Sequence, residues 1–269
     1  MAASSLLFVP ADRPERIAKA LAAGAGAVIV DLEDAVGPQS KDAARQQLAQ
    51  WLATAGDARV VVRVNGVATP WFAQDIALCA SPAVVAVMLP KAESAADIAR
   101  AATAAKAVLP LIETAQGFDR MREIGAAPRV ERLVFGTIDF QVDMGIEGEG
   151  EELLFFRSQM VLASRLAGIK APCDGVSTAL DAPDALRAES LRARRLGFGA
   201  KLCIHPKQVA VVNAAFAPSE EELAWARRVL DVATQSGGAA VALDGKMVDA
   251  PVIARARSLL QRSGVDGTA

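Results

Sequence analysis

The chain has 269 residues, of which 52% are hydrophobic and 22% charged, and its formal net charge at pH 7 is −2. This composition suits one large α/β core, and the near-neutral charge without a basic block argues against a nucleic-acid-binding protein. No signal-peptide layout is present and the apolar runs are too short to span a bilayer, so we expect a cytoplasmic protein with no membrane partner.

Short runs rich in Val, Ile and Leu recur along the chain, each followed by an Ala-rich stretch with apolar residues at helical spacing. This alternation is typical of βαβ units. Eight strands are predicted, at 5–10, 27–33, 60–65, 84–90, 108–113, 132–139, 173–177 and 201–205. Eight units favour a closed (β/α)8 TIM barrel over a doubly wound open sheet, and no GxGxxG fingerprint follows the first strand to support the open sheet.

An additional C-terminal helical segment follows the eighth strand. We expect a long helical region, a break at Gly237 and Gly238, and a last helix that begins near Pro251. The chain is therefore divided into a barrel domain at 1–234 and a C-terminal segment at 235–269. That segment is expected to serve as a lid, an oligomer contact or a cover for the side of the barrel.

Polar residues gather at the C-terminal ends of the predicted strands, where barrel enzymes place their active sites. They are Asp31, Glu33, Asp34, Arg63, Asn65, Lys91, Glu113, Asp139 and His205. Glu113 and Asp139 end neighbouring strands, so their carboxylates repel each other unless a cation neutralises them. Mg²⁺, or Mn²⁺ in its place, takes such oxygen ligands together with water and substrate. The alternative is that each carboxylate pairs with a base such as Arg63 or Lys91.

Arg63 alternates with Val62 and Val64 in its strand, so we expect its side chain to point into the mouth of the barrel. A guanidinium there would hold a carboxylate or enolate oxygen with two parallel hydrogen bonds. The alternative is that Arg63 only orients Glu33 or Asp34.

His205 is the only histidine in the sequence, and there is no tyrosine. A Ser-His-Asp hydrolase would depend on this residue alone, and no GxSxG elbow is present. The three cysteines are scattered without CxxC spacing, which argues against a zinc site or a disulfide framework. Hydrolase chemistry is therefore disfavoured, and we expect His205 to cap a helix or pack.

The motifs at the strand ends resemble the β-subunit-like citrate lyase family, also called CoA ester lyases, of the HpcH/HpaI aldolase superfamily. The match runs almost from end to end. It is carried by the segments 7–13, 30–36 with Lys41 and Arg45, 62–65, 89–91, 112–117, 135–139, 197–206 and 244–251.

The resemblance implies a Mg²⁺-dependent carbon–carbon lyase that cleaves a β-hydroxyacyl-CoA (citramalyl-CoA, malyl-CoA or a citryl thioester) to a keto acid and acetyl-CoA. It implies that Glu113 and Asp139 are the metal ligands, that Arg63 contacts the reacting oxygens, and that Glu33 and Asp34 hold water around the metal. Two other functions stay open: a metal-dependent aldolase that acts on a free 2-keto-hydroxy acid, and a non-catalytic subunit that binds CoA esters.

The resemblance also suggests that Arg16 and Lys19 face the phosphates of CoA. The alternative is that both are ordinary exposed charges on a helix.

Asp249 matches an acidic residue that, in related malyl- and citramalyl-CoA lyases, reaches the site of a neighbouring subunit. We therefore expect Asp249 to take part in proton transfer and the protein to be a homo-oligomer, a trimer. Ile138, where the family often has Glu, and Ala11, where Gly is frequent, leave the substrate open.

Overall fold

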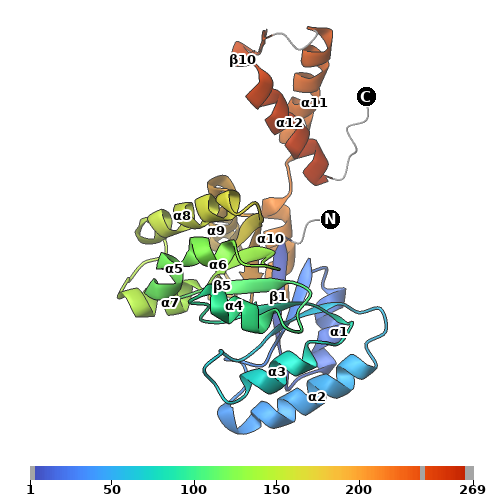
Figure 1. Ribbon diagram of the computed structural model, residues 1–269. Coiled ribbons are helices and arrows are strands. Elements are labelled where there is room, and N and C mark those ends of the chain that lie inside the picture. Colours follow the sequence, from blue (N-terminus) through green and yellow to red (C-terminus); the bar gives the residue numbers. More distant parts are fainter. Residues whose placement is uncertain (1–3, 237–239, 264–269) are drawn as a thin grey trace. The chain divides into compact units, whose positions relative to one another are not determined.

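The structure is a computed structural model that describes residues 4–236 and 240–263 (Figure 1). It contains two compact units, one that ends at Asn213 and one that begins at Ala214. None of the helices in the described ranges is long and apolar enough to cross a membrane.

The first unit is a closed barrel of eight parallel strands, in which each strand pairs with the next and the eighth pairs with the first. The strands are β1 (Ser5–Pro10), β2 (Ala27–Asp31), β3 (Val60–Arg63), β4 (Val84–Leu89), β5 (Val108–Ile112), β6 (Arg132–Phe135), β7 (Lys170–Asp174) and β8 (Ala200–Cys203). This arrangement confirms the predicted (β/α)8 barrel and its eight strands.

Helices and short 3₁₀ turns connect the strands. They are α1 (Glu15–Ala22), η1 (Pro38–Ser40), α2 (Lys41–Ala53), α3 (Phe72–Leu78), α4 (Ala95–Ala101), α5 (Ala115–Asp119), α6 (Met121–Gly125), α7 (Thr137–Met144), η2 (Glu151–Leu153), α8 (Leu154–Leu166) and α9 (Pro183–Leu196), with α10 (Pro206–Phe216) after the last strand. Several bury apolar residues completely, such as Ile17 on α1, Leu48 on α2 and Ile98 on α4. Burial of such a side chain contributes about 1.5–3 kcal/mol to stability.

One buried cluster with members from all eight strands fills the interior of the barrel. Its members are Leu6, Ile29, Val61, Ala86, Met88, Leu109, Leu111, Val134, Cys173, Ala200 and Leu202. Because successive side chains of a strand point to opposite faces, a residue two positions beyond a core member faces the same way. This alternation places three polar side chains, Asp31, Arg63 and Glu113, on the interior side at the barrel mouth.

Seven of the eight strands end earlier than predicted, and two of these differences affect residues of the site. The sixth was expected over 132–139, but β6 ends at Phe135 and Asp139 lies in the first turn of α7. The second was expected over 27–33, but β2 ends at Asp31, whose carboxylate accepts hydrogen bonds from the backbone N–H groups of residues 33 and 35 and turns the chain. Asp31 and Arg63 are thus the last residues of their strands, whereas Glu33, Glu113 and Asp139 lie on the turns and the helix that follow.

The second unit contains α11 (Glu220–Gln235), a hairpin of β9 (Val241–Leu243) and β10 (Lys246–Val248), and α12 (Ala250–Ser263). Its buried core is formed by Ala226, Val229, Val248, Ala256, Leu259 and Leu260. Because α11 packs against α12, this unit includes α11, which lies before the predicted boundary at 234. The predicted break at Gly237 and Gly238 lies outside the described residues.

Candidate active site

A cavity of about 510 Å³ opens at the C-terminal ends of the strands. The charged side chains that line it are Asp31, Asp34, Arg63, Glu113 and Asp139. Much of the remaining wall is apolar and includes Phe8, Leu111, Phe135, Val176 and Leu202. Active sites of TIM-barrel enzymes occupy this end of the fold, so the cavity is the candidate active site.

Arg63 is held in the cavity wall by Asp31. Its Nε and Nη2 donate to the two carboxylate oxygens of Asp31 at 2.7 and 2.6 Å, and its guanidinium lies 4.8 Å from the centroid of the Phe8 ring. Burial alone would lower the pKa of Arg63, but the hydrogen bonds and the charge of Asp31 outweigh it and raise that pKa above the ordinary value. Arg63 is thus a fixed cation beside the cavity.

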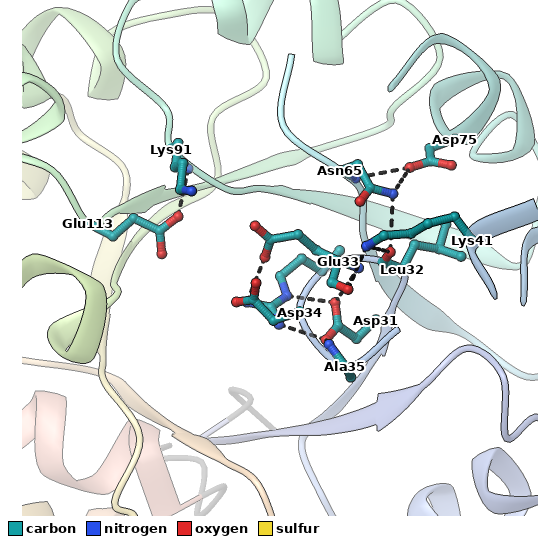
Figure 2. Close-up of polar contacts among 11 residues, drawn as sticks. Asp31, Leu32, Glu33, Asp34, Ala35, Lys41, Asn65, Asp75, Lys91 and Glu113 are labelled. Atoms are coloured by element: carbon teal, nitrogen blue, oxygen red, sulfur yellow. Dashed lines mark hydrogen bonds and ion pairs between the residues drawn. The ribbon is translucent and has the colours of Figure 1, made fainter. Parts of the chain in front are cut away.

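Arg63 also reaches the acidic turn, residues 31–35. Its Nη1 lies 3.0 Å from Glu33 Oε2 and 3.4 Å from Asp34 Oδ2. Burial raises the pKa of Glu33 to about 7; the charge of Arg63 lowers this pKa, and the neighbouring Asp34 and Asp31 raise it. Figure 2 shows the carboxylates of Glu33 and Asp34 lying close to each other over the turn. Glu33 can therefore exchange a proton near neutral pH.

Asp31, which holds Arg63 in place, was predicted to lie at a strand end but not to have a role of its own. Two signals in the sequence point to it: Asp31 is two positions beyond the core residue Ile29, and Arg63 is two positions beyond Val61. The register of β2 and β3, which pairs Asp31 with Arg63, is what brings the two together.

Glu113, directly after β5, is buried, with 3% of its surface exposed. Its Oε1 accepts a hydrogen bond from the backbone N–H of Lys91 at 2.8 Å, and Lys91 has a left-handed backbone, with φ of 47° (Figure 2). Burial, together with the charge of Glu33, raises the pKa of Glu113 to about 8, although the Lys91 amide lowers it; Asp139 adds to the rise. Without a cation, Glu113 therefore binds a proton at neutral pH.

Glu113 and Asp139 line the same cavity, and Asp139 is exposed at the start of α7. The described residues contain no group of three or more His, Cys, Asp or Glu side chains placed to hold a metal ion. Two carboxylates together with water and substrate are, however, the donor set that Mg²⁺ uses. The pair therefore fits a magnesium ion. The alternative pairing with bases is weaker, because Arg63 is bound to Asp31 and Lys91 meets Glu113 through its backbone.

Arg16 and Lys19 line a second cavity of about 420 Å³, together with His205. Phe8, Pro10 and Ile204 line both cavities, so the two adjoin on the barrel. His205 Nδ1 accepts a hydrogen bond from the Lys207 N–H at 3.1 Å at the start of α10, which is the capping role predicted for it.

Asp249 belongs to the second compact unit. Its Oδ1 accepts a hydrogen bond from the Val252 N–H at 3.3 Å, so it caps the first turn of α12. Within its own unit Asp249 is thus a helix-capping residue that is partly exposed.

The HpcH/HpaI aldolase/citrate lyase family model matches residues 4–206, and a model described as a C–C bond lyase of the TIM-barrel fold matches residues 160–268. A citrate lyase subunit beta-like protein of Deinococcus radiodurans is 39% identical over 277 residues, covering 95% of each chain. A (3S)-malyl-CoA thioesterase of Cereibacter sphaeroides is 36% identical, with 96% of this chain and 94% of that protein covered. The crystal structure of CitE from Mycobacterium tuberculosis with magnesium, acetoacetate and coenzyme A matches with a TM-score of 0.86 and 38% identity, covering 98% of each chain.

Proposed function

Because the chain belongs to the HpcH/HpaI aldolase/citrate lyase family, we propose that it cleaves a β-hydroxyacyl-CoA thioester, in a Mg²⁺-dependent reaction, to a keto acid and acetyl-CoA. The citrate lyase members of this family act on carbon–carbon bonds. The observation that carries the proposal is the convergence of Glu113, Asp139 and Arg63 on one cavity at the barrel mouth.

Glu113 and Asp139 are the side chains that would hold Mg²⁺, or Mn²⁺ in its place. Magnesium is present in the CitE structures of Mycobacterium tuberculosis with acetoacetate and coenzyme A and with pyruvate, which supports the proposal. A cation bound there would supply Lewis acidity to the hydroxyl and carboxylate oxygens of the acyl group.

Arg63 stabilises the negative charge that develops on oxygen as the carbon–carbon bond breaks. Two hydrogen bonds to Asp31 and the Phe8 ring hold its guanidinium in place, so little reorganisation is needed during the reaction. The β-hydroxyl loses its proton and becomes the carbonyl of the keto acid, while the electron pair of the broken bond passes to the thioester as an enolate. Protonation of that enolate at carbon gives acetyl-CoA.

Glu33 and Asp34 hold the water that moves these protons, and Asp249 is the other proton-transfer residue that we propose. A pKa of about 7 suits Glu33 to accept and return a proton at neutral pH. Asp249 would act from the second unit of a neighbouring subunit, so we propose a homo-oligomer, a trimer, as the active form.

Arg16 and Lys19 would bind the phosphates of CoA in the second cavity. Both side chains lie on one face of α1, three residues apart, and their cavity adjoins the mouth through Phe8, Pro10 and Ile204. A thioester substrate requires this arrangement, with its acyl group in the first cavity and its CoA in the second.

Citramalyl-CoA, which gives pyruvate and acetyl-CoA, is the substrate that we propose, ahead of malyl-CoA and citryl thioesters. Arg63 is the one cationic side chain among the described residues that line the first cavity, so a second carboxylate on the keto acid would lack a partner. Val176 and Leu202 instead offer apolar wall for a methyl group.

A panel of CoA thioesters assayed with Mg²⁺ tests the proposal, with the products identified by mass spectrometry. We expect citramalyl-CoA to give pyruvate and acetyl-CoA, and chelation of Mg²⁺ to stop the reaction. Release of free CoA with the hydroxy acid intact would indicate a thioesterase. Turnover of free hydroxy-keto acids alone would indicate an aldolase, and either result overturns the proposal.

A further inference from the structure

The Lys41 side chain reaches from the start of α2 to the acidic turn, residues 31–35 (Figure 2). Its Nζ donates hydrogen bonds to the carbonyl oxygens of Leu32 at 2.8 Å and of Glu33 at 2.7 Å. The ammonium also lies 5.4 Å from the centroid of the Trp71 ring, and only 5% of the Lys41 surface is exposed. A buried cation thus holds two consecutive carbonyl groups of the turn.

This location is unfavourable for a lysine on general grounds. Lys41 is the first residue of α2, where the helix dipole repels a positive charge, and burial of an ammonium costs free energy unless hydrogen bonds replace its water. Burial lowers the pKa of Lys41, while the charges of Asp31, Glu33 and Asp34 act to raise it. The two hydrogen bonds to the acidic turn and the Trp71 ring offset this cost, and the charge of Asp75 adds to that of the turn.

A second chain of hydrogen bonds reaches the same carbonyl group. Asn65 Nδ2 donates to the Leu32 carbonyl oxygen at 3.1 Å and to Asp75 Oδ2 at 2.7 Å. Arg45 Nε donates to Asp75 Oδ1 at 2.7 Å. Since Lys41 and Arg45 both lie on α2, this helix holds the turn directly and through Asp75 and Asn65.

Glu33 is consequently held on both sides of its backbone. Its carbonyl accepts from Lys41 and its N–H donates to Asp31 Oδ1 at 2.9 Å. Its side chain reaches Arg63, with Oε2 3.0 Å from Nη1. A shift of the turn therefore moves a carboxylate that lies against the cation of the site.

We propose that Lys41 is a positioning residue for the lyase reaction: its buried ammonium fixes the backbone of the acidic turn and so the carboxylates of Glu33 and Asp34 beside Arg63. The proposal rests on the proposed function, because the placement of these groups affects turnover only if they act on substrate. A misplacement of about 1 Å in a catalytic group costs on the order of 10²-fold in rate.

The test compares Lys41→Met, which removes both hydrogen bonds and keeps the length of the side chain, with Lys106→Met as the matched control. Lys106 Nζ also donates to a backbone carbonyl, that of Pro82 at 2.9 Å, but it lies before β5, at the opposite end of the barrel from the site. For each folded variant, kcat and KM for the thioester, Mg²⁺ binding by calorimetry, and hydrogen–deuterium exchange of residues 31–35 are measured.

We expect Lys41→Met to lower kcat by roughly 10- to 100-fold. KM for the thioester should stay unchanged and Mg²⁺ binding should be retained, because Arg16, Lys19, Glu113 and Asp139 lie outside the turn. Exchange of residues 31–35 should be faster than in the parent protein, and Lys106→Met should match the parent in every measurement. If Lys41→Met does not fold, Asn65→Ser, which removes the other hydrogen bond to the Leu32 carbonyl, should lower kcat in the same way.

Wild-type kcat in a folded Lys41→Met protein, or unchanged exchange in residues 31–35, would overturn the positioning role. A parent protein that cleaves no thioester refutes the proposed function instead. The exchange comparison between Lys41→Met and Lys106→Met still reports whether Lys41 holds the turn in that case, so the two failures are distinguishable.

Discussion

Gly136 leaves room for Glu113 that no other residue would leave: a Cβ atom at position 136 would lie 2.6 Å from both Cβ and Oε2 of Glu113. Gly136→Ala should therefore displace the buried carboxylate from the cavity. We expect Mg²⁺ binding to weaken and turnover to fall by roughly 10²-fold. Calorimetry and steady-state kinetics measure the two effects.

Gly37→Ala is the matched control for Gly136→Ala, because a Cβ at position 37 meets nothing within 4 Å and its φ is −63°. This variant should bind Mg²⁺ and turn over substrate like the parent. If Gly136→Ala did the same, Glu113 would not be held as the structure indicates.

Glu113 should make the stability of the metal-free protein depend on pH. Its pKa is raised from 4.5 to about 8 in the folded state, so the folded protein binds a proton that the unfolded chain releases. The contribution of Glu113 to the free energy of unfolding is therefore highest below pH 4.5 and falls as the pH rises to about 8. Urea denaturation in EDTA across this range measures the decrease, and Mg²⁺ should reverse part of it at the upper end.

The variant Glu113→Gln separates the pH dependence that Glu113 causes from that of Glu33, whose pKa is also raised, to about 7. The variant should show a smaller fall in stability with pH and no stabilisation by Mg²⁺. An unchanged pH dependence in Glu113→Gln would show that other groups cause it. Glu113→Ala and Asp139→Ala should likewise abolish Mg²⁺-dependent cleavage while the barrel stays folded.

Arg63→Lys should be a poor enzyme although it keeps the charge. A lysine ammonium cannot form the two parallel hydrogen bonds that Nε and Nη2 of Arg63 make to Asp31, so the cation loses its fixed direction. Loss of one preorganised group of this kind costs about 10²- to 10³-fold in kcat. Single-turnover kinetics with the preferred thioester measure this loss. Unchanged turnover in Arg63→Lys would contradict the role of Arg63 in charge stabilisation.

The recurrence of apolar strand runs followed by Ala-rich helical stretches was sufficient to predict the barrel, and the alternation of Arg63 with Val62 and Val64 predicted its inward direction. The core residue Val61, two positions before it, fixes that direction. Polar residues at strand ends also identified Glu113, Glu33 and Asp34 as residues of the mouth region, because parallel strands bring their C-terminal ends together.

Contacts between distant segments could not be predicted in the same way. The run from 132 continues through Gly136 and Ile138, so the local pattern extended the strand to Asp139, whereas backbone pairing ends it at Phe135. The hairpin of β9 and β10 was missed although Asp244-Gly245 is a favoured two-residue turn. The role of α11 depends on its packing against α12, which no local pattern shows.

Arg157 should be among the side chains on which stability depends most. It is completely buried, its Nε donates to the buried Asp174 at 2.9 Å, and its Nη1 donates to the Glu149 carbonyl oxygen at 2.7 Å. Arg157→Met leaves Asp174 with one buried cation fewer, so we expect a loss of about 3–5 kcal/mol in the free energy of unfolding.

Urea denaturation measures the effect of Arg157→Met, with Lys170→Met as the control. Lys170 pairs with Glu131 at 2.9 Å, but both side chains are exposed, and such pairs contribute less than about 1 kcal/mol. Adding Asp174→Asn to Arg157→Met should recover part of the loss. A loss as small as that of the control would mean that the buried pair is not an important source of stability.

A complementation experiment with Asp249→Ala tests whether the active site is shared between subunits. It caps α12 in a unit that packs its own core, and this unit does not need to act on the barrel of the same chain. If the residue completes a neighbouring site in a cyclic homo-oligomer, inactive Glu113→Ala and inactive Asp249→Ala subunits should complement each other when mixed, since some pairings join an intact barrel to an intact second unit. Subunit exchange is verified first by native mass spectrometry, and turnover of the mixture is then compared with that of each variant alone. Verified exchange without any return of activity, or an active protein that is monomeric, would refute the shared site.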